Sequence, residues 1–462
     1  MEKVFFGRSP RAVATFVCYV ANGTDRRVKD LLERELERSS FERRDRDLAT
    51  ELAYGMLRRR GTLDHLLARF SRIPFKKLQP RVLEVLRLGA YQLLFLDKVP
   101  APAAVHEAVE IAKRVSSPGA AGFVNACLRA LQRAIVSRES GPGDDPRKAL
   151  PVGEDAWCIF GEPVLPDPRR RPEEYLAAAH SHPEWLVRRW LARFGEEACR
   201  RLCEANNRHA GLTLRVNRQR ATREALLAEL VREGRWAKPL GADHVLVDQA
   251  GSLAGLGALR DGLCTVQGVA ASAAAELLAP RPGELVLDLC SAPGSKACQL
   301  AELAGGEARI LALDISPARL RLVAENARRL GARTVWPVAA DGTACERLLR
   351  AECDAALVDV PCSNTGVLMR RVESRWRLSA AKIAELAALQ RRLIASAAAV
   401  VRPGGRIVYS TCSLEAEENE QVAEWLCGTL AGWRLAESRY ILPQDTGADG
   451  GYVALAQRVE SA

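Results

Sequence analysis

Apolar residues in the first third of the chain recur with the spacing of helices. One face of such a helix is marked by Leu48, Leu52, Leu57, Leu63, Leu66 and Leu67. Residues 83–96 are strongly apolar, Pro100 and Pro102 interrupt the pattern, and Val105 to Val115 resumes it. The alternation typical of a strand is nearly absent, so the pattern predicts an all-α domain over residues 1–136.

Residues 137–172 break this pattern, with seven prolines and four glycines in 36 residues. That composition predicts a linker or an insertion without regular elements. Residues 173–262 then combine both patterns and predict a small mixed α+β middle domain. In it we expect a helix from Trp185 to Ala205, a strand at Thr213–Asn217, and a helix with Thr222 as its N-cap.

From residue 263 onwards, short apolar runs alternate with helical segments. Five runs lie at residues 285–288, 310–314, 335–338, 355–359 and 406–410. Strands that alternate with helices imply a parallel sheet covered on both faces. The fold class is therefore α/β, with a Rossmann-like domain over residues 263–462 whose ligands bind beyond the carboxyl ends of the strands.

The composition is that of a globular chain, since 48% of the 462 residues are hydrophobic and 27% are charged. The formal charge is +10, and residues 1–136 carry all of it, with 25 Lys and Arg against 15 Asp and Glu. The excess predicts that the first domain binds a polyanion, with nucleic acid as the first candidate.

Thirteen cysteines are scattered without a CxxC pair, which argues against both a zinc site and a disulfide framework. We therefore expect reduced thiols, no bound metal and a cytoplasmic protein. The apolar run Ala12–Ala21 is shorter than the roughly 20 residues that span a bilayer. It predicts a helix of the first domain, and no membrane partner is expected.

A candidate cofactor loop, residues 288–296, directly follows the first strand of the α/β domain. Its small residues and Gly294 allow a ligand to approach the backbone at the start of a helix. Asp314 ends the next strand and suits ribose hydroxyls, while Asp341 suits an adenine amino group. Because no GxGxxG or Walker motif is present, the set favours S-adenosylmethionine over a nicotinamide cofactor or ATP.

Two cysteines follow strands at this same edge of the sheet. Cys362 lies in Asp-Val-Pro-Cys after the fourth strand, and Cys412 lies in Ser-Thr-Cys-Ser after the fifth. A thiolate that adds to carbon 6 of a pyrimidine makes carbon 5 nucleophilic enough to accept a methyl group. Asp359 could protonate N3 of the ring if burial raises its pKa.

Two questions remain open at this point. A Pro-Cys loop carries the nucleophile in DNA cytosine-5 enzymes, which nominates Cys362, so spacing leaves the attacking cysteine undecided between Cys362 and Cys412. The amino-methyltransferase alternative needs an Asp/Asn-Pro-Pro-aromatic loop. This chain lacks the second proline and the aromatic residue, so carbon-5 chemistry is favoured.

The motifs together resemble one family. CSAPGSK (290–296), DVPCSNTGVLMRR (359–371) and YSTCSLEAEENE (409–420) are similar to bacterial 16S rRNA cytosine-C5 methyltransferases of type B, in the Nop/Sun group of RNA methyltransferases. Residues 44–67, 86–114 and 122–131 resemble the NusB-like RNA-binding domain of that family. Residues 182–190 and 214–217 resemble its middle region.

The resemblance implies a role for each residue. Cys412 would attack carbon 6, Cys362 would assist release, and Asp359 would contact the base and lie near the cofactor. The cofactor site would comprise Cys290, Ser291, Ala292, Pro293, Gly294, Ser295, Lys296, Asp314, Asp341 and Asp359. The substrate would be one cytosine of 16S rRNA, the one conventionally numbered 967, before the subunit is assembled, and the enzyme would act as a monomer.

The chain departs from the family pattern at a few positions. Ser295 stands where Gly is usual, and Asn364 stands in a second glycine position, where its tolerance of left-handed backbone would preserve the loop. The role of Lys296 is undecided between RNA, base and cofactor loop. The alternatives that we retain are the same chemistry on tRNA or 23S rRNA, and a non-catalytic RNA-binding or assembly factor.

Basic residues of the first domain are expected to hold phosphates. The candidates are Arg43, Arg44, Arg58, Arg59 and Arg60. The target base must leave its stack to reach the cysteines, so single-stranded or loop RNA is the expected partner.

Overall fold

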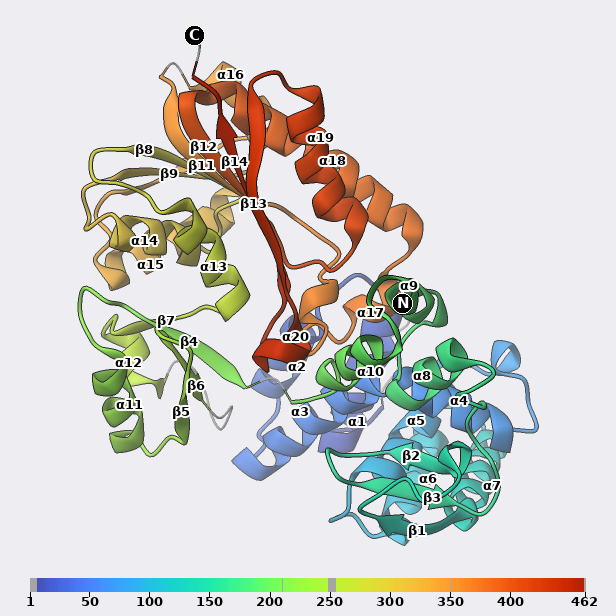
Figure 1. The fold of residues 1–462 in the computed structure, drawn as a ribbon. Coiled ribbons are helices and arrows are strands. Elements are labelled where there is room, and N and C mark those ends of the chain that lie inside the picture. The colour runs from blue at the N-terminus through green and yellow to red at the C-terminus, as the bar shows by residue number, and fades with distance from the viewer. Residues whose placement is uncertain (1–5, 210, 248–254, 350, 461–462) are drawn as a thin grey trace. The chain divides into compact units, whose positions relative to one another are not determined.

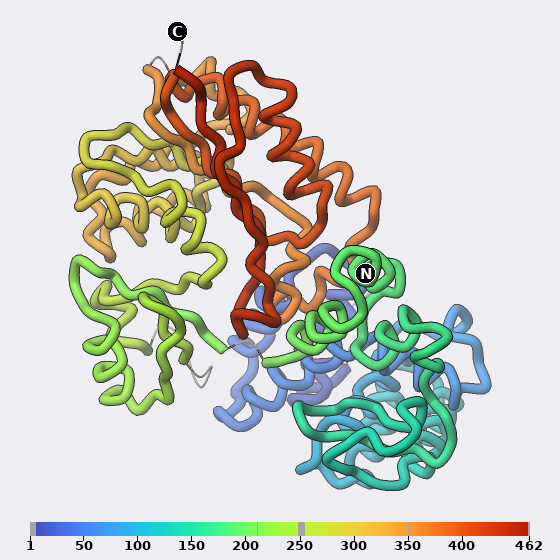
Figure 2. Tube along the Cα trace, in the orientation of Figure 1, coloured from blue at the N-terminus to red at the C-terminus, as the bar shows by residue number. Residues whose placement is uncertain are grey.

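The computed structural model describes residues 6–209, 211–247, 255–349 and 351–460. The chain forms two compact units, which Figures 1 and 2 colour by position along the chain. Unit 1 comprises Met1–Arg208 together with Arg371–Arg377, and unit 2 comprises His209–Arg370 together with Leu378–Ala462. Unit 1 therefore includes one short segment from far along the sequence.

Unit 1 begins with the helices that the apolar spacing predicts. They are α1 (Pro10–Gly23), α2 (Val28–Glu37), α3 (Arg43–Arg58), α4 (Arg60–Phe70), α5 (Pro80–Phe95), α6 (Ala101–Val115) and α7 (Pro118–Ala134), with a short 3-10 turn η1 (Phe75–Lys77). The run at residues 12–21 lies in α1, which Ser9 caps by accepting a hydrogen bond from the backbone N–H of Ala12.

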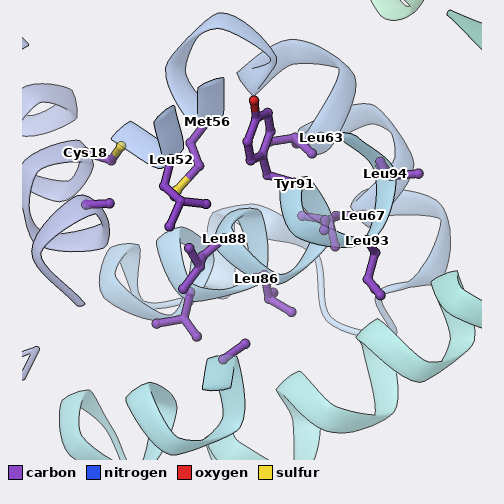
Figure 3. Packing of buried hydrophobic residues seen from close by; sticks show 14 of the residues in the cluster. Cys18, Leu52, Met56, Leu63, Leu67, Leu86, Leu88, Tyr91, Leu93 and Leu94 are labelled. Atoms are coloured by element: carbon purple, nitrogen blue, oxygen red, sulfur yellow. The ribbon is translucent and has the colours of Figure 1, made fainter. Parts of the chain in front are cut away.

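The buried core of unit 1 draws on every one of these helices, and Figure 3 labels Leu52 of α3, Leu63 and Leu67 of α4, and Leu86 and Leu88 of α5 among its members. Gly55 is needed here, because a Cβ at this position would lie 2.1 Å from the ring of Tyr91. The close approach lets the hydroxyl of Tyr91 donate to Glu51 over 2.6 Å. The helical spacing of apolar residues therefore predicts both where the helices lie and which of their faces are buried.

The segment 137–172 contains regular structure, so the prediction of an irregular segment is wrong. It holds an antiparallel sheet of order β1-β3-β2, formed by β1 (Ile135–Glu139), β2 (Ala149–Pro151) and β3 (Trp157–Phe160), with the turn η2 (Pro146–Lys148). Buried Leu150, Cys158 and Phe160 join the core of unit 1. Pro151 is the last residue of β2, a position where a strand tolerates a residue without a backbone N–H.

The predicted helix from Trp185 to Ala205 is interrupted. The chain forms α8 (Pro172–His180), α9 (Glu184–Phe194) and α10 (Glu196–Ala205), and the break lies at Gly195, whose φ is +78°. The distant segment 371–377 contributes α17 (Ser374–Arg377). Its buried Arg375 donates to the carbonyls of Ser181 (2.9 Å) and Asn206 (3.0 Å), which fixes this segment within unit 1.

Unit 2 begins with a small antiparallel sheet of order β5-β6-β4-β7. Its elements are β4 (Leu212–Val216), α11 (Arg223–Arg232), β5 (Ala237–Leu240), β6 (His244–Val247), α12 (Gly257–Arg260) and β7 (Cys264–Val266). Thr222 caps α11 as predicted, accepting from the N–H of Ala225 over 3.2 Å. Buried Arg215 of β4 pairs with Glu302 of the following domain at 2.7 Å.

The larger sheet of unit 2 has the order β10-β9-β8-β11-β12-β14-β13. Its strands are β8 (Leu285–Leu289), β9 (Arg309–Asp314), β10 (Val335–Ala339), β11 (Cys353–Asp359), β12 (Val401–Thr411), β13 (Trp433–Ile441) and β14 (Gly451–Arg458). The five predicted strands are β8–β12, which pair in parallel, while β13 and β14 add an antiparallel edge.

Helices cover both faces of this sheet (Figure 1). One apolar layer comes from α13 (Val269–Leu278), α14 (Ser295–Leu303) and α15 (Pro317–Leu330), and the other from α18 (Ala380–Val400) and α19 (Glu420–Thr429). Short elements complete the unit: η4 (Gly342–Ala344), α16 (Cys345–Leu348), η5 (Thr365–Val367), η6 (Ala416–Glu418) and α20 (Pro443–Thr446).

The strand order reverses beside β8, because the chain runs from β8 to β9 and β10 on one side and then to β11 and β12 on the other. Ligands of such sheets bind in the crevice at this reversal, beyond the carboxyl ends. In-register pairing sets Asp359 of β11 opposite Ser410 of β12. The motifs that follow β8, β9, β11 and β12 therefore meet at one edge. Within the described ranges, no helix has the length and apolarity to cross a membrane.

Two buried histidines of unit 1 predict sensitivity to acid. Burial lowers the pKa of His180 to about 3 and lowers that of His182 well below 6.5. The unfolded chain takes up both protons near pH 6.5, so this stability is complete above that pH and is lost as the pH falls toward 3. We expect a loss of at most about 1.4 kcal/mol per pH unit for each histidine.

Thermal unfolding of the wild type and of His182→Gln between pH 7.5 and pH 4.5 checks this expectation. The variant should unfold at a lower temperature at pH 7.5, and the difference should shrink as the pH falls. Two parallel curves would show that the histidines do not link folding to protons.

Candidate functional site

The loop between β8 and α14 has the backbone of a ligand cradle. Cys290 has a φ of +57° and Gly294 has a φ of +93°, and α14 begins at Ser295. A Cβ on Gly294 would lie 2.9 Å from Cγ1 of Val323 in α15. Glycine therefore permits the close packing of loop and helix, and it leaves the first N–H groups of α14 facing the carboxyl edge.

The two carboxylates assigned to a nucleoside lie at the ends of neighbouring strands: Asp314 ends β9, and Asp341 comes two residues after β10. Asp314, which ends β9 and is buried, accepts from the backbone N–H of Ala292 at 3.2 Å and of Ser316 at 3.0 Å. Asp341 is exposed and caps η4, where the hydrogen bonds from the N–H and hydroxyl of Thr343 lower its pKa. The guanidinium of Arg319 also pairs with Oδ2 of Asp314 at 3.2 Å, so a ligand would share this carboxylate with Arg319.

Ile315, which the sequence patterns did not single out, directly follows the carboxyl end of β9. Its side chain follows Asp314 directly and is 71% exposed, which is unusual for a large apolar residue beside a buried carboxylate. An apolar group in that place can cover the face of a flat ring. The signal in the sequence is the apolar residue that immediately follows the strand-end acid.

Asp288, the first residue of the predicted cofactor loop, has an unusual environment. It lies in β8 and is fully buried, and among the described residues no hydrogen bond of ordinary geometry reaches either carboxylate oxygen, although the Ser291 hydroxyl lies close enough to oppose the rise in its pKa. Burial raises its pKa to about 7, and the negative charge of Asp359 adds to the shift. A buried carboxylate that lacks such bonds is costly unless a donor or a cation meets it. Asp288 therefore suits a positively charged ligand group.

Asp359 and Lys296 form an ion pair between the loop and the end of β11. Nζ of Lys296 lies 2.8 Å from Oδ2 of Asp359, and the hydroxyl of Ser410 donates to Oδ1 over 2.6 Å. Burial would lower the pKa of Lys296, but the Asp359 carboxylate outweighs it and raises the pKa. The Asp359 side chain is 31% exposed, so a ligand can reach it.

The two predicted cysteines are in contact. Sγ of Cys362 lies 2.7 Å from Sγ of Cys412, and the backbone N–H of Cys412 also points to Cys362 Sγ at 3.2 Å. The thiol of Cys412 donates to Oδ1 of Asn364 over 3.3 Å. Asn364 has a φ of +64°, which confirms the left-handed backbone expected there.

The two thiols differ in their surroundings. Cys362 is 9% exposed, whereas Cys412 is half-buried. The pKa of Cys362 is raised well above the ordinary value by its hydrogen bond with Cys412, by burial, and by the charges of Cys412 and Glu418. Cys412 is therefore the more accessible of the two thiols.

The predicted arginines all lie in unit 1, in different environments. Arg43 and Arg44 are exposed at the start of α3. Arg58 is buried, Arg59 stacks on the ring of Phe95 at 4.8 Å, and Arg60 lies 5.3 Å from the ring of Trp376. Because a phosphate contact needs an accessible guanidinium, Arg43 and Arg44 are the better placed candidates. No cluster that could hold a metal ion occurs among the described side chains.

The buried carboxyl group of Asp288 is expected to lower the stability of the folded protein when it ionises. Its folded pKa of about 7 exceeds the unfolded value of 3.8, so the folded protein loses stability as the pH rises from 4 to 7. The loss is at most about 1.4 kcal/mol per pH unit. Asp288→Asn should therefore gain thermal stability relative to the wild type as the pH rises to 8. A stability difference that does not change with pH would contradict the assignment.

Comparisons with known proteins match the whole arrangement. A family model of the 16S rRNA methyltransferases RsmB/F matches residues 275–455, a NusB family model matches residues 8–133, and a ferredoxin-like domain model of RsmF/B-like methyltransferases matches residues 182–253. These matches confirm the predicted Rossmann-like methyltransferase domain, the helical NusB domain and the mixed middle domain.

Similar proteins from bacteria align with most of the chain. A probable ribosomal RNA small subunit methyltransferase B of Bacillus subtilis is 35% identical over 85% of this chain and 82% of its own length. A ribosomal RNA small subunit methyltransferase B of Pseudomonas putida is 34% identical over 89% and 90%. The crystal structure of PH0851 shares the fold, with a TM-score of 0.76, 23% identity, and coverage of 97% of this chain and 99% of its own. The chain therefore belongs to the RsmB/F family of 16S rRNA methyltransferases.

Proposed function

We propose that this methyltransferase places a methyl group on carbon 5 of a cytosine in 16S rRNA, through a covalent bond between Cys412 and carbon 6. The observation that carries the proposal is the contact of two thiols, 2.7 Å apart, at the edge that also holds Asp359 and the loop after β8. Transfer to an amine or a hydroxyl needs no thiol pair, whereas carbon 5 of a pyrimidine needs a nucleophile at carbon 6.

The residues at the carboxyl edge fit S-adenosylmethionine. Asp288 offers a buried carboxylate to a positively charged group, and Asp314 offers oxygens to ribose hydroxyls. Asp341 and exposed Ile315 suit the polar edge and the face of adenine. The loop 290–296 supplies close backbone contact. When bound, this cofactor supplies the methyl group as an electrophile.

The chain's own residues then act on the cytosine. The Cys412 thiolate forms a bond to carbon 6, and the electrons of the C5–C6 double bond become available at carbon 5. Carbon 5 would then accept the methyl group that a bound cofactor supplies, and the departing cofactor would keep the electrons of the broken bond. The proton of carbon 5 then passes to solvent, and the electrons of that C–H bond re-form the C5–C6 double bond. The bond between Cys412 and carbon 6 breaks, and its electrons return to the Cys412 sulfur.

Three neighbours assist these steps. Asp359 contacts N3 of the base, and Lys296, 2.8 Å from its carboxylate, holds a proton that can pass to N3 as the thiolate adds. Proton transfer of this kind is worth about 10²–10⁴ in rate. Cys362, whose Sγ touches that of Cys412, assists the release of Cys412 from carbon 6.

The proposed substrate is unstacked RNA, reached in the cytoplasm before the small subunit is assembled. The NusB domain carries the basic excess of the chain, and exposed Arg43 and Arg44 are the side chains that we assign to phosphates. A base in a helix must leave its stack to reach both thiols and the cofactor at once, which favours a loop or single strand.

The cysteine roles predict two different defects. In an assay with labelled S-adenosylmethionine and protein-free 16S rRNA, Cys412→Ala should lose activity by on the order of 10³-fold or more, because the attacking atom is absent. Cys362→Ala should instead accumulate a covalent complex with RNA that resists denaturation. Cys427→Ala, a half-buried cysteine outside the site, is the matched control and should keep wild-type activity.

Each outcome of that assay is informative. Formation of 5-methylcytosine at one position of 16S rRNA supports the substrate as well as the chemistry. Methylation of only tRNA or 23S rRNA would retain the chemistry and reject the substrate. Absence of methylation on every RNA, with binding intact in Cys412→Ala, would favour a non-catalytic assembly factor.

Gly294 predicts a defect in cofactor binding. Alanine there meets Val323 at 2.9 Å and retains an unfavourable φ of +93°, so the loop must move. We expect binding of S-adenosylhomocysteine, measured by calorimetry, to weaken at least about tenfold, the equivalent of 1.4 kcal/mol. Gly283→Ala is the matched control, since its φ is +82° and its Cβ would meet open space. Equal effects of the two substitutions would show that the loop packing has no role in binding.

A further inference from the structure

A buried glutamate forms hydrogen bonds with both of the loops that carry the cysteines. Glu418, the last residue of η6, is fully buried. Its Oε1 accepts from the backbone N–H of Ser363 at 2.9 Å, and its Oε2 accepts from the hydroxyl of Ser413 at 2.5 Å. The hydroxyl of Ser363 also donates to Oε2. Ser363 and Ser413 are the residues that directly follow Cys362 and Cys412.

Further hydrogen bonds surround the Glu418 carboxylate. The two serine hydroxyls lie 3.0 Å apart, and the amide of Gln390 in α18 donates to Oε1 of Glu418 at 3.1 Å. The same amide nitrogen donates to the carbonyl of Pro361, at 2.9 Å, in the loop that carries Cys362. One carboxylate thus receives hydrogen bonds from the Cys362 loop, the Cys412 loop and the helix behind them.

The charge environment of Glu418 is unusual for a residue with only a packing role. Within the described residues it forms no ion pair, and burial raises its pKa although the hydrogen bonds from Ser363 and Ser413 oppose the shift. Burying a carboxylate without a counter-ion is costly, and apolar residues of similar volume are often as stable or more stable. Such a loss of folding stability is expected where the carboxylate is needed to hold neighbouring groups in a fixed geometry.

We propose that Glu418 is the positioning residue that sets the distance between the thiols of Cys362 and Cys412. This inference rests on the proposed function for the roles of the cysteines, but it makes a separate claim about the loops. Without the carboxylate, the loops after β11 and β12 would keep their strand pairing up to Asp359 and Ser410. Beyond that pair, the links that join Ser363 to Ser413 through the carboxylate would be lost.

The kinetic test compares Glu418→Ala, Glu418→Gln and Glu424→Gln. Misplacing a reacting group by about 1 Å can cost about 10²-fold, so Glu418→Ala should lower kcat by about that factor. The KM for RNA and the Kd for S-adenosylhomocysteine should stay within about threefold of the wild type, because the residues assigned to them lie elsewhere. Glu418→Gln retains an oxygen that can accept from the N–H of Ser363 and should recover part of kcat.

Glu424→Gln is the matched control, since it removes the same charge from an exposed residue of α19, the next helix. It should behave like the wild type in every measurement. A kcat for Glu418→Ala equal to that of the control would overturn the proposal. A loss shared equally by kcat, KM and cofactor affinity would show general unfolding rather than positioning.

A second readout needs no methyltransferase activity. The oxidant diamide removes two hydrogens from neighbouring thiols and leaves a disulfide, and peptide mapping after blocking of the free thiols identifies the pair. The wild type should form the Cys362–Cys412 disulfide quickly, whereas Glu418→Ala should form it at least about tenfold more slowly. Equal rates would reject the positioning role even if the enzyme proved to methylate a different substrate.

The serines provide variants that keep the carboxylate if Glu418→Ala fails to fold. Ser363→Ala and Ser413→Ala each remove one hydroxyl that bonds to Glu418. Each should slow disulfide formation, and the double variant should add little beyond the larger single effect, because both act through the same carboxylate. Independent, additive effects would contradict a shared positioning contact.

Discussion

The site depends on the parallel pairing of β11 with β12, in the register that sets Asp359 opposite Ser410. Because the two strands point the same way, the loops that follow them leave the sheet at one edge. Cys362 comes three residues after Asp359, and Cys412 comes two residues after Ser410. A one-residue slip of either strand would turn its side chains to the opposite face. The 2.7 Å contact between the two thiols, the Lys296–Asp359 ion pair and the Glu418 links all follow from this register.

Electrostatics divides this edge into two parts. On the cofactor side, Asp288, Asp314 and Asp341 present carboxylates, one of them buried without a hydrogen bond of ordinary geometry among the described residues. On the base side, Lys296 offsets Asp359, and the thiols share a hydrogen bond in place of a counter-ion. The first arrangement suits a cationic cofactor, and the second suits a reaction in which a proton must be held near the base.

Local sequence patterns predicted the elements that repeat a simple period. The five parallel strands, Thr222 as an N-cap and the left-handed Asn364 are all found. The patterns failed where contacts from distant residues decide. Residues 137–172 form strands because Leu150, Cys158 and Phe160 join a core made by the helices before them. β14 was missed because it is buried on both faces and shows no alternation.

The same limit applies to the site. Cys362, Cys412, Asp314 and the loop after β8 could be placed from the sequence, because each directly follows a recognisable strand. Glu418 could not, since an acid in a Glu-rich turn looks ordinary until its burial is known. Asp288 was placed at the start of the cofactor loop, but the sequence does not show that its side chain is fully buried. Gly195, which divides α9 from α10, was read as part of one helix because the apolar period continues across it.

The most direct test of the account identifies the cysteine that bonds to the base. RNA that contains 5-azacytosine has no proton to lose after methyl transfer, so the enzyme should remain attached to it. Digestion and mass spectrometry of the trapped complex locate the modified residue. The account predicts that the nucleotide is carried by Cys412 in the wild type. A nucleotide carried by Cys362 would contradict the assignment of roles, and the absence of any adduct would contradict covalent catalysis.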